Sequence, residues 1–401
     1  MKKTLILLTA ILTLLCLLAG CTGTAQPGPA VTDAPATPTA APGGTAPTET
    51  PPPADGSPVV TGSLPLSYAQ QFTVDYYSDG SALITIGGTD KFLLLPEGAE
   101  PPANADPDLV LLRQPLTAIY NASSAVMDMF IQLDSLDRVR FTSTTYGNWG
   151  LPEVRDALDA ETLIYAGKYS APDFELLLEE KCTFALENTM IYHSPDIKEQ
   201  LENLDIPVMV ERSSYEPHPL GRVEWIKLYG LLLGKEAEAE AFFNAQVRQL
   251  DELGSLPSEG MTVAYFHIST ARTAVVRKPG DYVSKMIELA GGHYVFSELP
   301  GQDDSAMSTM SMQLESFYAG AKDADVLIYN STIDGELETV AQLLEKSELL
   351  SDFKAVKAGE VWCSEHDLFQ KSSAAATIIR ELNLILSGRA EDEMQFFHRL
   401  K

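Results

Sequence analysis

Apolar and polar positions change their period several times along the chain. Between Gln71 and Pro96 three short segments, FTVDYY, ALITIG and KFLLLP, are rich in β-branched and aromatic residues and are separated by turn-forming residues. This pattern predicts a β-hairpin region. Beyond it, apolar runs of strand length alternate with segments of helical period, which favours an α/β domain with a mainly parallel sheet over residues 59–217.

The alternation stops near Leu220, where the pattern becomes helical. GRVEWIKLYGLLLG is followed by KEAEAEAFFNAQVRQLDEL, in which Phe243, Val247 and Leu250 form one apolar stripe. From residue 257 onward, strand and helix patterns alternate again to the end of the chain. We therefore predict two Rossmann-like α/β lobes, 59–217 and 257–401, bridged by a single long helix within residues 218–256.

The first residues have the pattern of an export signal. Lys2 and Lys3 precede an apolar run from Leu5 to Leu18, which is too short to span a bilayer comfortably. The run ends in Leu-Ala-Gly-Cys, which resembles a bacterial lipobox. The resemblance implies that residues 1–20 are a lipoprotein signal peptide and that Cys21 is lipidated; an ordinary cleaved signal is the alternative.

Residues 21–58 are rich in Pro, Thr, Ala and Gly and nearly lack bulky apolar side chains. Such a composition cannot bury enough surface to fold, so we predict a disordered tether. Anchor and tether together favour a protein held on the outer face of a cell membrane, in a cell with one membrane.

Composition narrows the function further. The chain has 401 residues and a formal net charge of −28, which disfavours binding to nucleic acid. Cys182 and Cys363 are the two cysteines beyond Cys21. No disulfide framework or zinc spacing is present, and two free thiols are favoured over a bond between the halves.

No catalytic motif is found: the chain lacks G-x-S-x-G, a P-loop, G-x-G-x-x-G and H-E-x-x-H. Aromatic and cationic residues instead follow predicted strands, where open α/β sheets bind ligands. Tyrosine and tryptophan offer flat apolar faces to the body of a ligand, and arginine and lysine could pair with the carboxylates or phosphates of an anionic ligand. The candidate ligand-binding residues are Tyr120, Tyr146, Trp149, Lys168, Tyr169, Tyr215, Arg272, Arg277 and Phe369.

Several segments resemble the periplasmic-binding-protein family of iron-complex and cobalamin importers. They include APDFELL from Ala171, LENLDIPV from Leu201, IELAGG from Ile287 and FKAVKAGEVW from Phe353, in the family's order. The run SSYEPHPLGRVEWIKLYGLLLG is similar to a Gram-positive branch for iron complexes. The resemblance covers about residues 70 to 390.

This resemblance implies a clamp with little hinge motion that captures a siderophore, haem or cobalamin between its lobes and delivers it to an ABC permease. It also implies one glutamate per lobe for docking. Here the corresponding positions contain Asp196, Glu199 and Gln370. We expect no enzymatic activity, no cofactor and no resident metal. A free metal-ion receptor and an extracellular enzyme on the same fold remain alternatives.

Overall fold

The computed structural model describes residues 57–102, 104–253, 260–299, 309–390 and 394–401. The predicted signal peptide, Cys21 and nearly all of the tether lie outside these residues. Among the helices described, none has both the length and the apolar character to cross a membrane.

The first lobe is built on a parallel sheet of five strands in the order β12-β11-β6-β7-β8. Its central strands are almost wholly buried, as expected for a parallel sheet covered on both faces. The strands are β6 (Ile119–Asn121), β7 (Val139–Thr142), β8 (Ile164–Tyr165), β11 (Phe184–Glu187) and β12 (Val208–Val210). The helices between them are α1 (Ser124–Gln132), α2 (Pro152–Asp159), α3 (Phe174–Glu179) and α4 (Pro195–Asn203).

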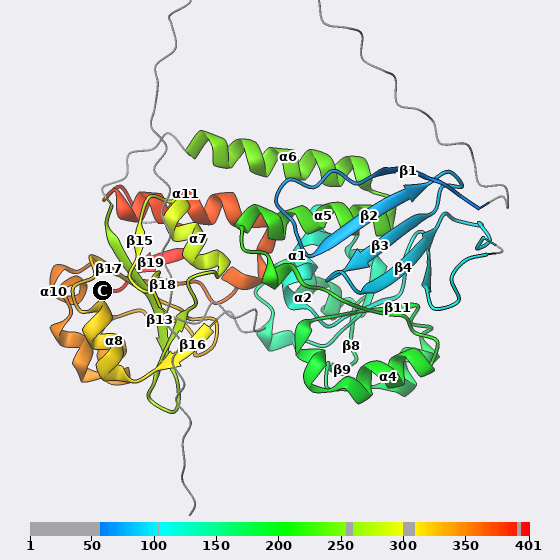
Figure 1. Cartoon of the computed structure of the whole chain (residues 1–401). Coiled ribbons are helices and arrows are strands. Elements are labelled where there is room, and N and C mark those ends of the chain that lie inside the picture. Colours follow the sequence, from blue (N-terminus) through cyan, green and yellow to red (C-terminus); the bar gives the residue numbers. More distant parts are fainter. Residues whose placement is uncertain (1–56, 103, 254–259, 300–308, 391–393) are drawn as a thin grey trace, which may run out of the picture. The chain divides into compact units, whose positions relative to one another are not determined.

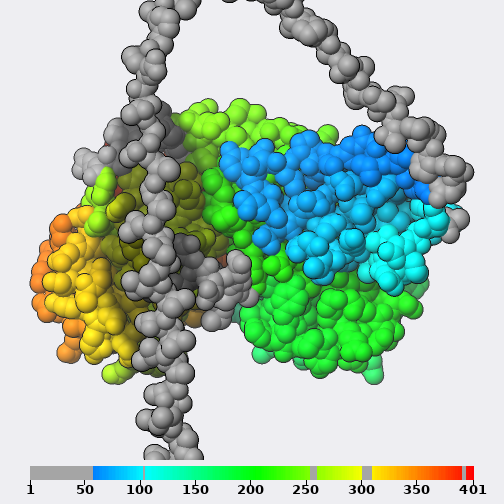
Figure 2. Space-filling model, in the orientation of Figure 1, coloured from blue at the N-terminus to red at the C-terminus, as the bar shows by residue number. Residues whose placement is uncertain are grey.

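A separate sheet precedes this lobe. The predicted hairpin region forms β2 (Phe72–Tyr77), β3 (Ala82–Ile86) and β4 (Asp90–Leu95), flanked by β1 (Val60–Ser63) and β5 (Val110–Arg113). The strands pair antiparallel except β4 with β5, which are parallel. On the face seen in Figure 2, this sheet, in blue, adjoins the light-green surface of the helical segment 236–253.

The connection between the lobes is a pair of helices, α5 (Pro219–Leu233) and α6 (Glu236–Leu253) (Figure 1). Gly234 ends α5 in the left-handed conformation, with φ of 69°, which glycine adopts without strain. The predicted single helix is therefore divided in two. The helices fold back on each other closely enough that a Cβ at Gly230 would lie 2.5 Å from the Cβ of Ala239.

The second lobe contains a seven-stranded mixed sheet, with the order β16-β14-β13-β17-β18-β19 and β15 also pairing with β13. Its strands are β13 (Thr262–Ile268), β14 (Ala274–Arg277), β15 (His293–Tyr294), β16 (Thr309–Met312), β17 (Val326–Tyr329), β18 (Val361–Ser364) and β19 (Phe397–Arg399). Its helices are α7 (Tyr282–Leu289), α8 (Leu314–Ala321), α9 (Val340–Lys346), α10 (Lys354–Ala358) and α11 (Ala375–Leu386). The predicted two-lobed α/β class is thus confirmed.

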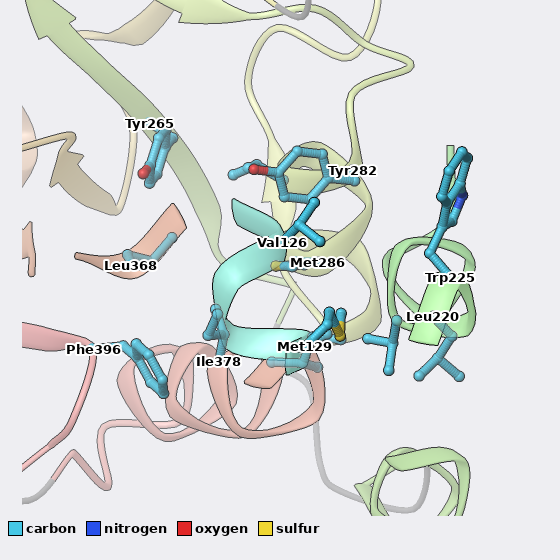
Figure 3. Close-up of a cluster of buried hydrophobic side chains, with 14 of the residues drawn as sticks. Val126, Met129, Leu220, Trp225, Tyr265, Tyr282, Met286, Leu368, Ile378 and Phe396 are labelled. Carbon is cyan, nitrogen blue, oxygen red and sulfur yellow. The ribbon is translucent and has the colours of Figure 1, made fainter. Parts of the chain in front are cut away.

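One hydrophobic cluster extends through both lobes, and a second, smaller one lies within the first lobe. Val126 and Met129 of α1 belong to the same buried cluster as Met286 of α7 and Ile378 of α11 (Figure 3). Separating the lobes would expose these side chains to water, at a free-energy cost of about 25 cal/mol for each Å² of apolar surface. The core therefore favours a fixed arrangement of the lobes.

Candidate ligand-binding cleft

A cleft of about 500 Å³ lies at the carboxyl end of the parallel sheet of the first lobe. Its walls are the loops that follow β6, β7, β8, β11 and β12, together with Arg222 of α5. The carboxyl edge of an open α/β sheet is where ligands bind in such folds, because the loops there converge on one place. The cleft is therefore the candidate functional site.

Arg222 is a buried charged residue among those that line the cleft. Its side chain is buried, with a residue exposure of 6%, and its guanidinium carbon lies 3.9 Å from the centre of the Tyr282 ring. Its Nε has no hydrogen-bond partner, and no carboxylate of the described chain forms an ion pair with it. Arg222 thus combines a cation–π contact with unused hydrogen-bonding capacity.

The amino end of α1 faces the same space. Ala122, Ser123, Ser124 and Ala125 all line the cleft. Ser123 is the residue before the helix, but its hydroxyl does not cap α1; it donates instead to Oε1 of Glu211, at 2.9 Å. The second oxygen of Glu211 accepts from the backbone N–H of Ser213, at 2.7 Å.

The remaining walls are polar inside and apolar at the rim. Hydroxyls and amides come from the loops after β7 and β11, among them Ser143, Thr145 and Asn188. At the rim, Tyr165 and Met190 are 38% and 48% exposed. A ligand with an apolar body and polar substituents would meet matching groups in such a cleft.

Glu187 ends β11 directly before the loop that lines the cleft. It is fully buried, and neither carboxyl oxygen has a hydrogen-bond partner within the described chain. Burial alone raises the pKa of Glu187 to about 8. The carboxyl is therefore mainly protonated at neutral pH.

The predicted residues of the first lobe separate into three groups. Lys168 and Tyr169 line the cleft. Tyr120 and Trp149 do not offer their rings to it, because both side chains are buried in the core. Their apolar surface is needed for packing, which the sequence pattern alone did not distinguish from binding.

Tyr146 and Tyr215 lie in the predicted loops but are not among the residues that line the cleft. Tyr146 is 48% exposed, and its hydroxyl donates to Asp159 at 3.2 Å. The Tyr215 ring lies under the guanidinium of Arg212, with 4.6 Å between the carbon and the ring centre. Both are engaged by neighbours within their own lobe.

The predicted residues of the second lobe are also outside this cleft. Arg277 is 7% exposed; it lies 3.8 Å from Asp281 and 4.5 Å from the ring centre of Phe369. Arg272 is exposed in the turn between β13 and β14, with a positive φ of 57°. Arg277 and Phe369 thus form an internal contact of the lobe.

Of the predicted docking residues, Asp196 and Glu199 are exposed on α4, whereas Gln370 joins the two lobes. Its Oε1 accepts from the N–H of Gly150 at 2.8 Å, and its Nε2 donates to the carbonyl of Asn148 at 2.7 Å. A side chain at Gly150 would collide with Asp367, because its Cβ would lie 2.0 Å away. The amide both accepts and donates here, whereas an ionised glutamate can only accept, so Glu would not replace Gln370 at neutral pH without loss.

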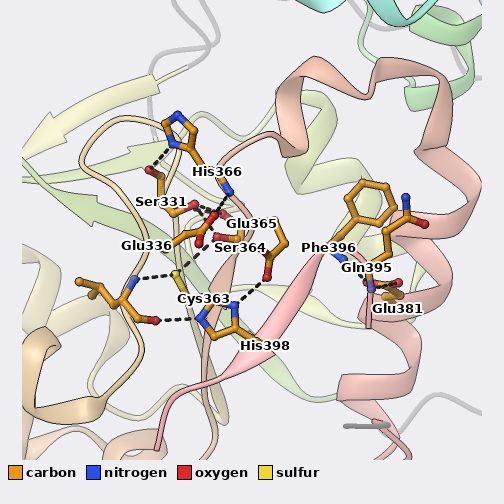
Figure 4. A network of polar contacts seen from close by, with 11 residues as sticks. Ser331, Glu336, Cys363, Ser364, Glu365, His366, Glu381, Gln395, Phe396 and His398 are labelled. Atoms are coloured by element: carbon orange, nitrogen blue, oxygen red, sulfur yellow. Dashed lines mark hydrogen bonds and ion pairs between the residues drawn. The ribbon is translucent and has the colours of Figure 1, made fainter. Parts of the chain in front are cut away.

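Figure 4 shows a cluster near the carboxyl terminus that contains a thiol, an imidazole and a carboxylate. Cys363 and Cys182 are both free thiols, and Cys363 is fully buried. Hydrogen bonds with Cys363, the Leu337 carbonyl and Glu365 raise the pKa of His398 to about 10. With a buried sulfur and both ring nitrogens engaged, the cluster holds β19 against β18 and has no group available to attack a substrate.

Nowhere in the described ranges do three histidine, cysteine or acidic side chains gather as a metal ion would require. Arg222, whose Nε has no hydrogen-bond partner, was not among the candidate residues from the sequence. A signal was present: PLGRVEWIKLYGLLL contains three charged residues in an otherwise apolar helix. A charged side chain in a buried helix needs a compensating partner, so its presence in the sequence indicates either a structural interface or a binding site.

Comparison with known proteins gives three kinds of match. A family model described as periplasmic binding protein matches residues 118–364, so the sheet β1–β5 precedes the matched region. An uncharacterized lipoprotein of Methanocaldococcus jannaschii is 24% identical over 336 residues, which cover 76% of this chain and 77% of the relative.

Solved structures share the fold at low identity. A periplasmic binding protein from Veillonella parvula has a TM-score of 0.57 and 17% identity, covering 78% of this chain and 99% of its own. A periplasmic haem binding protein from Pseudomonas aeruginosa has a TM-score of 0.56 and 14% identity, covering 72% of this chain and 98% of its own.

Proposed function

We propose that the chain, which belongs to the periplasmic binding protein family, is the extracytoplasmic receptor of an ABC importer for an iron complex, a haem or a cobalamin. The observation that carries the proposal is the 500 Å³ cleft at the carboxyl edge of the first parallel sheet. The haem-binding relative with the same fold adds support for a tetrapyrrole. No bond is made or broken in this function.

Binding would use residues that already line the cleft. Tyr165, Tyr169 and Met190 would contact the body of the ligand, because their surfaces are apolar and partly exposed. Lys168 would add a positive charge at the rim. Serine and threonine hydroxyls of the cleft would form hydrogen bonds with the polar groups of the ligand. The shared core around α1 would keep the cleft formed in the absence of ligand.

The direct test is a binding panel on the intact protein in detergent: haemin, an iron(III) tris-catecholate, an iron(III) tris-hydroxamate and cyanocobalamin. Quenching of tryptophan fluorescence should report binding, because Trp149 belongs to the same loop as cleft residues Thr145 and Asn148. We expect one member to bind below about 10 μM, roughly −7 kcal/mol. Failure of all four would overturn the proposed function.

Delivery requires a permease and a position at the membrane. We propose that Asp196 and Glu199, exposed on α4, contact permease cations, and that Cys21 carries the lipid anchor. Named relatives of the chain are lipoproteins, which supports the anchor. Cys21→Ser should release the protein from the membrane fraction while leaving affinity for the panel unchanged. Retention of the variant on the membrane would contradict lipidation at Cys21.

Two alternatives have less support among the described residues. A free metal-ion receptor needs three or more ligating side chains at one point, and the described residues form no such group. An enzyme needs an accessible nucleophile beside a base, and the Cys363–His398 cluster offers a buried sulfur. The receptor for a chelated or tetrapyrrole nutrient is therefore the function with the most support.

A further inference from the structure

We propose that the part of the cleft lined by the amino end of α1 and by Arg222 is an oxyanion site. The inference rests on the proposed function and narrows it: the ligand carries a carboxylate, or an oxyanion of the same chemistry, that binds in this part. Two independent features of the structure lead to this proposal.

The first feature is the open end of α1. This helix of nine residues has no side-chain cap, because the hydroxyl of Ser123 is directed to Glu211, and its first turn contains no acidic residue. The backbone N–H groups of Ser124 and Ala125 have no acceptor in the described chain. Unpaired N–H groups at a helix start carry partial positive charge and bind anions.

The second feature is Arg222, which approaches from a different element. Its side chain is more than nine-tenths buried and lines the same cleft, and its Nε has no partner. A buried cation without an anion is unfavourable unless some group compensates it. The Tyr282 ring compensates one face of the guanidinium and leaves the hydrogen-bonding edge for an oxyanion.

Glu211 also lines this part of the cleft and is the acidic group to be considered as a partner. Its two oxygens are occupied by the Ser123 hydroxyl and the Ser213 N–H, and no ion pair joins it to Arg222. Glu211 therefore holds the loop after β12 against the start of α1 and forms no ion pair with Arg222.

The layout predicts how a ligand is oriented. Its anionic group would enter first, between Arg222 and the start of α1, and its apolar body would remain at the rim near Tyr165 and Met190. Among the proposed ligands this favours haem, which bears carboxylates, and anionic iron chelates. It disfavours uncharged chelates and cyanocobalamin.

The test uses pairs of probes that differ in charge: haemin against its dimethyl ester, and the iron(III) tris-catecholate against the neutral tris-hydroxamate. Affinities are measured with the intact protein, with Arg222→Gln, with Arg222→Lys and with Arg248→Gln. Arg248 lies exposed on α6, so it is the matched control within the same helical pair.

We expect the anionic member of a pair to bind at least about 10-fold more tightly than the neutral one, and Arg222→Gln to weaken it by about 30-fold. Arg222→Lys should retain part of the preference, and Arg248→Gln should retain all of it. The preference should depend only weakly on added salt, because Arg222 is buried.

Three results would overturn the oxyanion site while leaving the proposed function intact. They are equal affinity for both members of the pair that binds, an anion preference that survives Arg222→Gln, and binding of cyanocobalamin alone. Absence of binding by every probe would overturn both. Arg222→Gln should keep the unfolding midpoint of the wild type, which separates lost recognition from lost folding.

Discussion

Two sides of helix α5 handle buried charge in opposite ways. On one side, Glu224 is fully buried and accepts from the backbone N–H groups of Ser67, Tyr68 and Ala69, at 2.7–3.0 Å, with Lys227 at 3.2 Å. On the other side, two residues earlier in the helix, Arg222 faces the cleft without an ion-pair partner.

The difference separates a structural interface from a site. Next to Glu224, Glu216 also accepts three N–H bonds, from Gln70, Gln71 and the Trp225 indole. These two carboxylates fasten the segment that leads into β2 onto the bridging helices. By contrast, Arg222 lines the cleft with no hydrogen-bond partner at Nε, and Glu187, buried directly before cleft residue Asn188, has none at its carboxyl oxygens.

The strongest test of the comparison is Glu224→Ala. The substitution leaves three N–H groups without their acceptor and removes one of the two carboxylates that contact Lys227, so we expect the free energy of unfolding to fall by about 5 kcal/mol. Urea denaturation followed by circular dichroism measures it. Glu240→Gln is the matched control, because Glu240 is the other partner of Lys227 but is 52% exposed. A loss below about 1 kcal/mol in Glu224→Ala would contradict the structural role.

On the cleft side, Glu187→Gln should change the pH dependence of stability. The pKa of Glu187 is about 8 in the fold against an ordinary value of 4.5, so the unfolded chain releases its proton first as pH rises. The wild type should lose about 4 kcal/mol of stability, relative to the variant, between about pH 4.5 and 8, and no more above that range.

Urea midpoints at pH 5, 6, 7 and 8 for the two proteins measure this difference. Exposed Glu199→Gln serves as the control, since its curve should run parallel to that of the wild type. If the curve of Glu187→Gln also ran parallel to that of the wild type, the pKa of Glu187 would not be raised in the fold, and a partner would be stabilising its ionised form.

Much of the fold follows from the sequence, and particular elements show why. The strands β11, β13 and β17 are continuous apolar runs, and the helices α2, α4 and α7 have clear helical periods. By contrast β6 and β19 contain three residues each and gain their stability from pairing with neighbours, which local patterns do not report.

For the site, the loops were predictable but the side chains were not. Lys168 and Tyr169 line the cleft as expected, whereas Tyr120 and Trp149 turn into the core. The same residue types serve both purposes, and only the packing of each loop decides between them. Arg222 was missed because it lies in a helix rather than in a loop, and its exposure to the cleft depends on how α5 meets α1.

The contact between the lobes provides an intermediate test. In Gln370→Glu the carboxylate still accepts from Gly150 but faces the Asn148 carbonyl without a proton to donate. We expect a loss of about 2 kcal/mol at pH 7, measured by urea unfolding, with partial recovery near pH 4 as the new carboxyl protonates. An unchanged midpoint would show that the amide contributes nothing across the lobes. Glu199→Gln again supplies the control for a change of surface charge.

The smallest effect on stability is expected at Arg222 itself. Arg222→Met removes the cation–π contact with Tyr282, worth about 1 kcal/mol, but it also removes the desolvation cost of a buried charge without an anion. These terms oppose each other, so the free energy of unfolding should change by less than about 1 kcal/mol in urea without ligand. A loss above about 3 kcal/mol, similar to that of a broken buried ion pair, would mean that Arg222 is structural like Glu224. With ligand present, the wild type should be clearly more stable than Arg222→Met. A bound oxyanion would stabilise the wild type, whereas the variant has no cation to bind it.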